Sequence, residues 1–299
     1  MAPHRRSILI TGCTKGSAGH ALALEFASHG MRVFATARSL SSLEGLEEHG
    51  IETLTLDVTD SKSIAALKVE IETRTGGKLD ILFNNAGSMY EAPAIEADPS
   101  RVRKMFDANV FGVFEMVTAF TPLLMAADPD KSRPPTIINT ASVLAVIPYP
   151  FSSAYNATKA AVAAYSDSLR LELAPFGIKV VTLYMGVVST GISSPEAIKF
   201  SPESFYIEAE AGVRKRSRDH QVSGMKADRF AKEVAKEILT AKPGYGKGEY
   251  IWKGSNAFLV WLLHAVGWRK IFDKSSEDEV GFTVAIKKSI AQKTPKSSH

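Results

Sequence analysis

Short apolar runs alternate with longer amphipathic segments through the first two thirds of the chain. The apolar runs have the length of buried strands and occupy 7–11, 32–37, 52–57, 81–84, 136–140 and 179–184. Segments with helical periodicity lie between them, at 19–29, 61–73, 99–124 and 152–175. Strands that alternate with helices pair in parallel through right-handed crossovers. The pattern therefore predicts an α/β fold, with one doubly wound parallel sheet and helices on both faces.

We expect one domain over residues 1–299, because no linker-like stretch interrupts the chain. A polar insert at 191–226 breaks the alternation, which resumes with a helix at 227–241 and a strand at 249–253. An apolar segment follows at 255–272. Trp261 and Trp268 in this segment are seven residues apart and are expected to share a helix face. The residues after Lys287 have the composition of a frayed terminus.

Composition excludes several classes of protein. Hydrophobic residues make up 45% of the chain and charged residues 23%, which is ordinary for a globular protein. A net charge of +4 does not indicate a nucleic-acid partner. The lone cysteine, Cys13, excludes an intramolecular disulfide framework, and the N-terminus has no secretory signal pattern. The longest apolar stretch, 257–267, is too short to span a bilayer, so we expect a cytoplasmic protein.

A glycine-rich turn joins the first strand to the first helix. It contains Gly12, Thr14, Lys15, Gly16 and Gly19. Glycine permits positive φ angles and a close approach of the backbone to a ligand. The helix N-terminus beyond the turn offers free N–H groups and a partial positive charge. Strand, glycine turn and helix in this order predict a dinucleotide pyrophosphate site of the Rossmann type.

The end of the second predicted strand indicates which cofactor is bound. NAD-preferring enzymes of this type tend to place an acid there, whereas this strand has none and is followed by Arg38. A guanidinium can bind a phosphate through two hydrogen bonds, and Lys15 adds a second positive charge. The two cations therefore predict NADP(H), with its 2′-phosphate, as the cofactor.

Tyr155 and Lys159 are four residues apart in a segment with helical periodicity, so they lie on one helix face. A cation near a phenol stabilises the phenolate and lowers its pKa by roughly 1–3 units. Such a phenol can exchange a proton near neutral pH, as general acid–base catalysis requires. Ser142 ends a predicted strand thirteen residues before Tyr155, and Asn109 lies in the middle of a predicted helix.

Together these residues resemble the short-chain dehydrogenase/reductase family over about 7–190. The resemblance implies that Tyr155 donates a proton, that Ser142 hydrogen-bonds the substrate oxygen, and that Lys159 lowers the tyrosine pKa and holds the ribose. It also implies that Asn109 fixes a water beside Lys159. The remaining cofactor contacts that it implies are Asp57 at the adenine, Asn85, Ala86 and Gly87 of an NNAG motif, and Val188 and Thr190 near the nicotinamide.

The sequence departs from the family pattern at two points. The last glycine of the loop comes one residue late, and Met185 replaces the proline that usually precedes Gly186. The longer loop and the stretch 33–38 resemble the fungal acyldihydroxyacetone-phosphate reductases, which favours NADPH-dependent reduction of a ketone or aldehyde on a hydrophobic or lipid-like substrate. A reductase of fungal secondary metabolism, a hydroxysteroid or retinol dehydrogenase, and a non-catalytic NADP-binding regulator are the alternatives.

The sequence indicates less about the residues that bind the substrate. The resemblance makes 191–226 the substrate lid, and its basic run 214–218 is either a solvated helix face or a site for a phosphorylated substrate or an anionic lipid. The apolar segment 255–272 caps an apolar pocket, packs against another subunit, or contacts a membrane such as the endoplasmic reticulum or a lipid droplet. We expect a small hydrophobic substrate, no nucleic acid and no metal, and the sequence leaves a homo-oligomer open.

Overall fold

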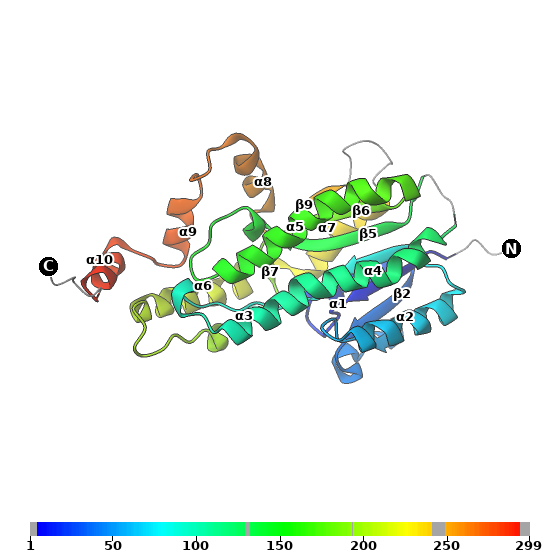
Figure 1. The fold of residues 1–299 in the computed structure, drawn as a ribbon, viewed down its shortest axis with the longest axis horizontal. Helices are drawn as coiled ribbons and strands as arrows, with labels where there is room; N and C mark the ends of the chain where they lie inside the picture. Colours follow the sequence, from blue (N-terminus) through cyan, green and yellow to red (C-terminus); the bar gives the residue numbers. More distant parts are fainter. Residues whose placement is uncertain (1–4, 129–131, 193, 241–248, 294–299) are drawn as a thin grey trace.

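The computed structural model describes residues 5–128, 132–192, 194–240 and 249–293. Its centre is a seven-stranded parallel sheet with the strand order β3-β2-β1-β4-β5-β6-β9 (Figure 1). This confirms the predicted doubly wound α/β fold. The strands are β1 (Ser7–Thr11), β2 (Arg32–Ala37), β3 (Glu52–Thr55), β4 (Ile81–Asn84), β5 (Thr136–Ser142), β6 (Lys179–Met185) and β9 (Tyr250–Lys253).

Helices cover both faces of this sheet because side chains alternate along each strand. Ile8 and Ile10 of β1 join the core beneath α1 (Ala18–Ser28) and α7 (Ala227–Thr240). Leu9 points to the opposite face and joins the core beneath α2 (Ser61–Thr75), α4 (Gly112–Met125) and α5 (Ser153–Leu173). Strand β1 therefore contributes to both cores. The predicted end of α7, Ala241, lies outside the described residues.

One long helical segment runs from Pro99 to Met125. It consists of α3 (Pro99–Phe106), a π-helical turn (Asp107–Phe111) and α4. By length and composition alone this segment could cross a membrane, but 50% of its most apolar window is buried inside the fold. Its Met116, Val117 and Phe120 are among the residues of the sheet core. We therefore assign this segment as a core helix of the fold.

The remaining elements gather at the end of the molecule opposite the N-terminus (Figure 1). They are a small parallel pair, β7 (Val188–Ser189) and β8 (Met225–Lys226), and the helices α6 (Glu210–Ser223), α8 (Ala257–Val266), α9 (Asp273–Glu279) and α10 (Val284–Lys293). A separate apolar cluster, which includes Phe151, Phe200, Val213 and Val280, holds this region together. The polar insert thus contains a regular helix, α6.

Two predictions about the C-terminal region were wrong. The residues from Lys288 to Lys293 do not form a frayed end, because α10 continues to Lys293 and its lysines pair with distant acids, whereas the last part of the predicted tail, 294–299, lies outside the described residues. Lys287 Nζ lies 2.6 Å from Glu277, and Lys293 Nζ lies 3.1 Å from Glu208. Trp261 and Trp268 do not share a helix face, since α8 ends at Val266, before the second tryptophan.

Candidate active site

The glycine loop, Gly12–Gly19, passes close to the turn that follows β4. Gly12 has a φ of 75°, and a Cβ there would lie 2.8 Å from the Ala86 Cα. A Cβ on Gly19 would lie 2.5 Å from both the Gly12 carbonyl oxygen and the Asn85 side-chain nitrogen. Both positions therefore require glycine. In the one-residue-longer loop, the third glycine lets the first turn of α1 pack against the loop itself.

Hydrogen bonds fix the NNAG turn against the end of β1. The Thr11 hydroxyl accepts from the backbone N–H groups of Asn85, at 3.0 Å, and of Ala86, at 2.9 Å. The Asn85 side chain donates to the Thr11 carbonyl at 2.9 Å. A Cβ on Gly87 would lie 3.1 Å from the Asn109 side-chain oxygen. The predicted NNAG residues thus form one wall of the site.

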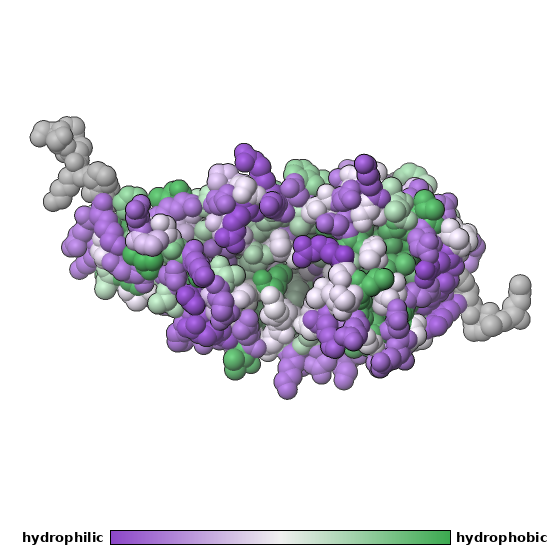
Figure 2. All heavy atoms as spheres, turned by 90° about the horizontal axis from the view of Figure 1, so that it is seen from below, coloured by the Kyte–Doolittle hydropathy of each residue, from purple (hydrophilic) through white to green (hydrophobic). Residues whose placement is uncertain are grey.

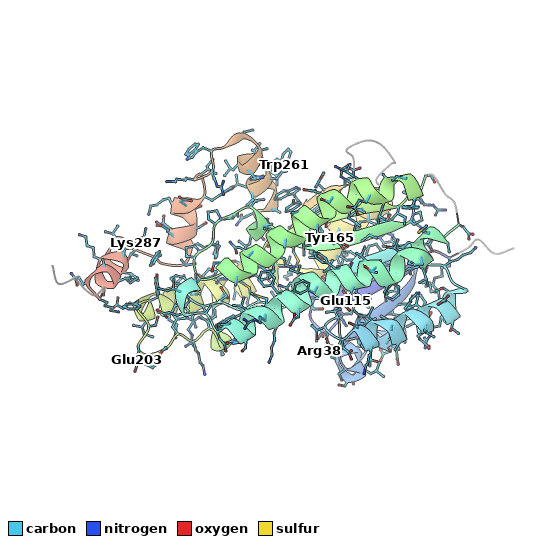
Figure 3. The ribbon with its side chains drawn as sticks, in the orientation of Figure 1. Arg38, Glu115, Tyr165, Glu203, Trp261 and Lys287 are labelled. Atoms are coloured by element: carbon cyan, nitrogen blue, oxygen red, sulfur yellow. The ribbon has the colours of Figure 1, made fainter. Side chains whose placement is uncertain are left out.

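The two predicted phosphate-binding cations, Lys15 and Arg38, are exposed and line the same cavity as the glycine loop. Arg38 is labelled in Figure 3. The Lys15 backbone is held by a hydrogen bond to the Ser42 carbonyl at 2.8 Å. Hydrogen bonds from the Thr59 backbone and hydroxyl hold the pKa of Asp57 low, and the charge of Arg38 lowers it further. Asp57 is therefore an ionised carboxylate beside Arg38, at the edge of the cavity.

The three residues Ser142, Tyr155 and Lys159 meet at the carboxyl end of β5. Ser142 is the last residue of this strand, and Tyr155 and Lys159 lie in the first two turns of α5. The Tyr155 side chain is hydrogen-bonded to Ser142. Lys159 Nζ lies 5.7 Å from the centroid of the Tyr155 ring and donates to the Thr140 carbonyl at 2.9 Å. All three side chains are buried, and all three line the cavity.

Burial changes both ionisation equilibria, and one prediction about them was wrong. Burial raises the pKa of Tyr155 to about 12, against the opposing effect of the Ser142 hydrogen bond. The sequence predicted a lowered value, but burial of the phenol outweighs the interaction that lowers its pKa. Burial lowers the pKa of Lys159 to about 8. At neutral pH the phenol therefore keeps its proton, which is the form that a proton donor needs.

Asn109 lies in the π-helical turn, where the regular hydrogen-bond ladder is interrupted. Its side-chain oxygen accepts from the Ser88 backbone N–H at 2.8 Å, and its nitrogen donates to the Ser88 carbonyl at 2.9 Å. The same nitrogen donates to the Thr158 hydroxyl at 3.1 Å. Asn109 is 1% exposed and does not line the cavity. It therefore connects the turn after β4 to the helix that carries Lys159.

A cavity of about 1200 Å³ extends from the glycine loop to the insert 191–226. Of the predicted cofactor contacts, Thr14, Gly16, Val188 and Thr190 line this cavity, whereas Gly19 packs behind the loop. Apolar side chains from the loop after β5 and from α8 form much of the remaining wall. These are Val143, Leu144, Ile147, Leu259, Val260 and Leu263. Figure 2 shows the molecule from below, where hydrophobic residues lie at the floor of a hollow among polar ones.

Sequence reasoning missed a buried ion pair at the lid side of the cavity. Arg216 of α6 pairs with Glu91 of the loop after β4, and both side chains are 3% exposed. The Ser152 hydroxyl, at the start of α5, donates to the same carboxylate at 3.1 Å. The charge of Glu91 also contributes to the raised pKa of Tyr155. No motif marks Glu91, and Arg216 was visible only as one member of a basic run.

The rest of the basic run is neutralised locally. Arg214 lies 3.3 Å from Glu210, and Lys215 lies 2.6 Å from Asp219, each one helical turn away. Arg218 is exposed. The run is therefore neither a uniform solvated face nor a converging cluster of cations, since its central arginine points inward and its neighbours pair along the helix.

We expect Arg216→Met to lower the free energy of unfolding by about 3 kcal/mol, because it leaves the Glu91 carboxylate buried without the guanidinium. The double variant Arg216→Met, Glu91→Leu should recover part of that loss. Chemical denaturation of both variants measures this, with the exposed Arg218→Met as the matched control. Equal stability of Arg216→Met and Arg218→Met would contradict the role of the pair.

Comparisons with known proteins agree with this geometry. A family model described as short chain dehydrogenase matches residues 6–199. A short-chain dehydrogenase of Hypocrea virens, virD, is 38% identical over 274 residues, which cover 91% of this chain and 92% of that protein. An NADPH-dependent 1-acyldihydroxyacetone phosphate reductase of Schizosaccharomyces pombe is 44% identical over 187 residues, 62% of this chain and 61% of that enzyme.

Among solved structures, a short-chain dehydrogenase from Streptomyces avermitilis superimposes with a TM-score of 0.74 and 26% identity. The superposition covers 94% of this chain and all of the other. The similarity therefore extends beyond the sheet to the lid and the C-terminal helices.

Proposed function

The chain belongs to the short-chain dehydrogenase/reductase family of nicotinamide-dependent oxidoreductases, and from this premise we propose that it uses NADPH to reduce a ketone or aldehyde on a neutral, largely apolar small molecule. The observation that carries the proposal is the buried set of Ser142, Tyr155 and Lys159 in one cavity with the glycine loop. Reduction requires a protonated acid beside the carbonyl oxygen, and burial keeps Tyr155 protonated.

Gly12 and Gly19 let the loop pack closely against the NNAG turn and against itself, since a Cβ at either position would collide with protein atoms. Gly16 borders open space in the cavity, where a dinucleotide pyrophosphate could lie beside the N-terminus of α1. When bound, the nicotinamide supplies the hydride. Tyr155 donates its proton to the carbonyl oxygen, and the Ser142 hydroxyl hydrogen-bonds the same oxygen as negative charge develops. Lys159 would hold the ribose beside the phenol, and Asn109 fixes the helix that carries Lys159.

The preference for NADPH over NADH rests on Lys15 and Arg38. Both cations are exposed at the cavity. A 2′-phosphate there could form charge-assisted, bidentate contacts with the guanidinium. β2 ends at Ala37, where an NAD-preferring enzyme tends to place an acid. The reductive direction follows because cells usually keep NADPH reduced.

The neutral, apolar character of the substrate rests on the walls of the cavity. Leu259, Val260 and Leu263 of α8 contribute apolar surface. Arg216, which also lines the cavity, is paired with Glu91 and so offers no uncompensated charge to a phosphate. This favours a neutral ketone, as in the secondary-metabolite hypothesis, over the acyl ketone phosphate that the sequence placed first.

An acyl ketone phosphate remains the second candidate, because the Schizosaccharomyces pombe reductase shares 44% identity over its matched region. NADPH consumption by the purified protein discriminates between the candidates when it is tested against neutral aromatic ketones, quinones, steroids, retinal and an acyl ketone phosphate. We expect a higher kcat/KM for a neutral ketone. Preference for the phosphate would overturn the neutral assignment, and no turnover with any compound would overturn the proposed activity.

Activity should also depend on pH through Lys159. Its pKa is lowered by burial from 10.5 to about 8, so the cation is present below about pH 8 and is lost above it. If the cation orients the ribose, kcat/KM for reduction should be level below pH 8 and should fall above it. A pH–rate profile measures this. A rate that stays level up to pH 10 would contradict the role of the charge.

α8 has a second, exposed face in addition to the one that lines the cavity. Phe258 is 68% exposed and Trp261 is 42% exposed, and Trp268 beyond the helix is 70% exposed. The sequence left open a membrane surface and a second copy of the chain as contacts of this segment. Co-sedimentation of the purified chain with phosphatidylserine vesicles tests the contact with a membrane. Size-exclusion chromatography of the same chain tests the contact with a second copy.

A further inference from the structure

Four side chains from three parts of the chain form a polar corner on the lid side of the cavity: Tyr149, Arg216, His220 and Glu279. His220 Nε2 lies 2.6 Å from a carboxylate oxygen of Glu279, which joins α6 to the end of α9. The guanidinium of Arg216 lies over the Tyr149 ring, 5.4 Å from its centroid. None of these residues takes part in the chemistry proposed at Tyr155.

The polar corner offers a hydrogen-bond acceptor to the cavity, Glu279, whereas the Nε–H group of Arg216 is enclosed by protein. Burial raises the pKa of Glu279, but His220, Tyr149 and Arg216 together outweigh burial and hold it below its usual range, so the group is a carboxylate at neutral pH. Its side chain is 43% exposed at the cavity. The Arg216 Nε–H group is buried and has no hydrogen-bond partner among the described residues.

The charged groups at the polar corner leave no excess of positive charge. Glu91 neutralises Arg216, and Glu279 faces a histidine. A phosphate or carboxylate would therefore meet no uncompensated cation there. A neutral hydroxyl group matches better, because it can donate to the Glu279 carboxylate without bringing a charge of its own.

Apolar side chains surround the polar corner within the cavity. Leu263, Ile271 and Phe272 belong to one apolar cluster that includes α8. Pockets of this kind bind an apolar body, and a few convergent polar groups fix its orientation. The corner would thus set which end of the substrate points away from the cofactor.

We propose that the polar corner binds a hydroxyl or phenol group of the substrate, with Glu279 accepting its hydrogen. This rests on the proposed function and specifies its substrate class. The substrate is a neutral ketone or aldehyde with an apolar body and a hydroxyl group distant from the carbonyl. Glu279 is then a specificity determinant for the reduction.

Two series of ketones test this with the NADPH-loaded enzyme: straight-chain 2-alkanones of increasing length, and the same compounds with a terminal hydroxyl group. At the chain length that reaches the corner, the hydroxyl should lower KM by about tenfold or more, as expected for a hydrogen bond to a charged group of about 1.5–3 kcal/mol. In Glu279→Ala this ratio of KM values should fall to near one.

Glu277→Ala is the matched control. It removes a carboxylate from the same helix, α9, but Glu277 pairs with Lys287 and does not line the cavity. This variant should keep the hydroxyl preference. The inference is overturned if no hydroxylated ketone exceeds its plain counterpart, or if the preference survives in Glu279→Ala. Turnover of the plain ketones alone would leave the proposed function intact, whereas turnover of neither series would count against both.

Discussion

The variant Tyr155→Phe is expected to lower kcat for ketone reduction by about 10²–10⁴-fold, because it removes the general acid. The phenol is buried beside Ser142 in the cavity, where bulk water has little access to replace it as the proton donor. NADPH affinity should change little, because the variant keeps the aromatic ring. Steady-state kinetics and fluorescence titration with NADPH measure the two effects separately.

Tyr165→Phe is the matched control for that variant. Tyr165 lies on the same helix, α5 (Figure 3). Its ring stacks on Phe114 with ring centroids 4.0 Å apart. Its hydroxyl has no part in the proposed reaction, so activity should stay within a small factor of the wild type. Similar kcat values for the two variants, or near-normal activity of Tyr155→Phe, would contradict the proposed acid.

The variant Arg38→Asp is expected to change the ratio of affinities for NADPH and NADH by about a thousandfold in favour of NADH. A charge-assisted hydrogen bond contributes about 1.5–3 kcal/mol, and an aspartate would add repulsion to its loss. Each 1.4 kcal/mol is tenfold in affinity. Dissociation constants for both cofactors in wild type and variant give the ratio.

An exposed charge elsewhere provides the control for Arg38. Arg229 on α7 is 72% exposed and pairs with Glu233. Arg229→Asp should leave the cofactor ratio unchanged. Equal affinity of the wild type for NADPH and NADH would show that Lys15 and Arg38 do not select the 2′-phosphate.

Much of the fold could be predicted from the sequence because its signals are local. A buried strand such as Ser7–Thr11 and a helix such as Ser61–Thr75 are marked by their own apolar spacing. α10 could not be predicted in this way. It is polar, and its position depends on pairs between Lys287 and Glu277 and between Lys293 and Glu208, which only the tertiary structure brings together.

The candidate site also has a part that local sequence patterns predict and a part that depends on tertiary contacts. Tyr155, Lys159 and Ser142 have fixed spacings on α5 and β5, and the structure brings them into one cavity. The pair of Glu91 and Arg216 joins residues 125 positions apart, so no local pattern reveals it. The raised pKa of Tyr155 depends on burial, which spacing alone does not determine.

The central claim is that Tyr155 protonates a carbonyl group as it receives hydride from NADPH. The most direct measurement follows deuterium from NADPH labelled at C4 of the nicotinamide into the product of a neutral ketone, by mass spectrometry. We expect one deuterium on the new carbinol carbon with the wild type and almost none with Tyr155→Phe under the same conditions. Binding of NADPH without labelled alcohol from any ketone, or equal labelling by both proteins, would contradict it.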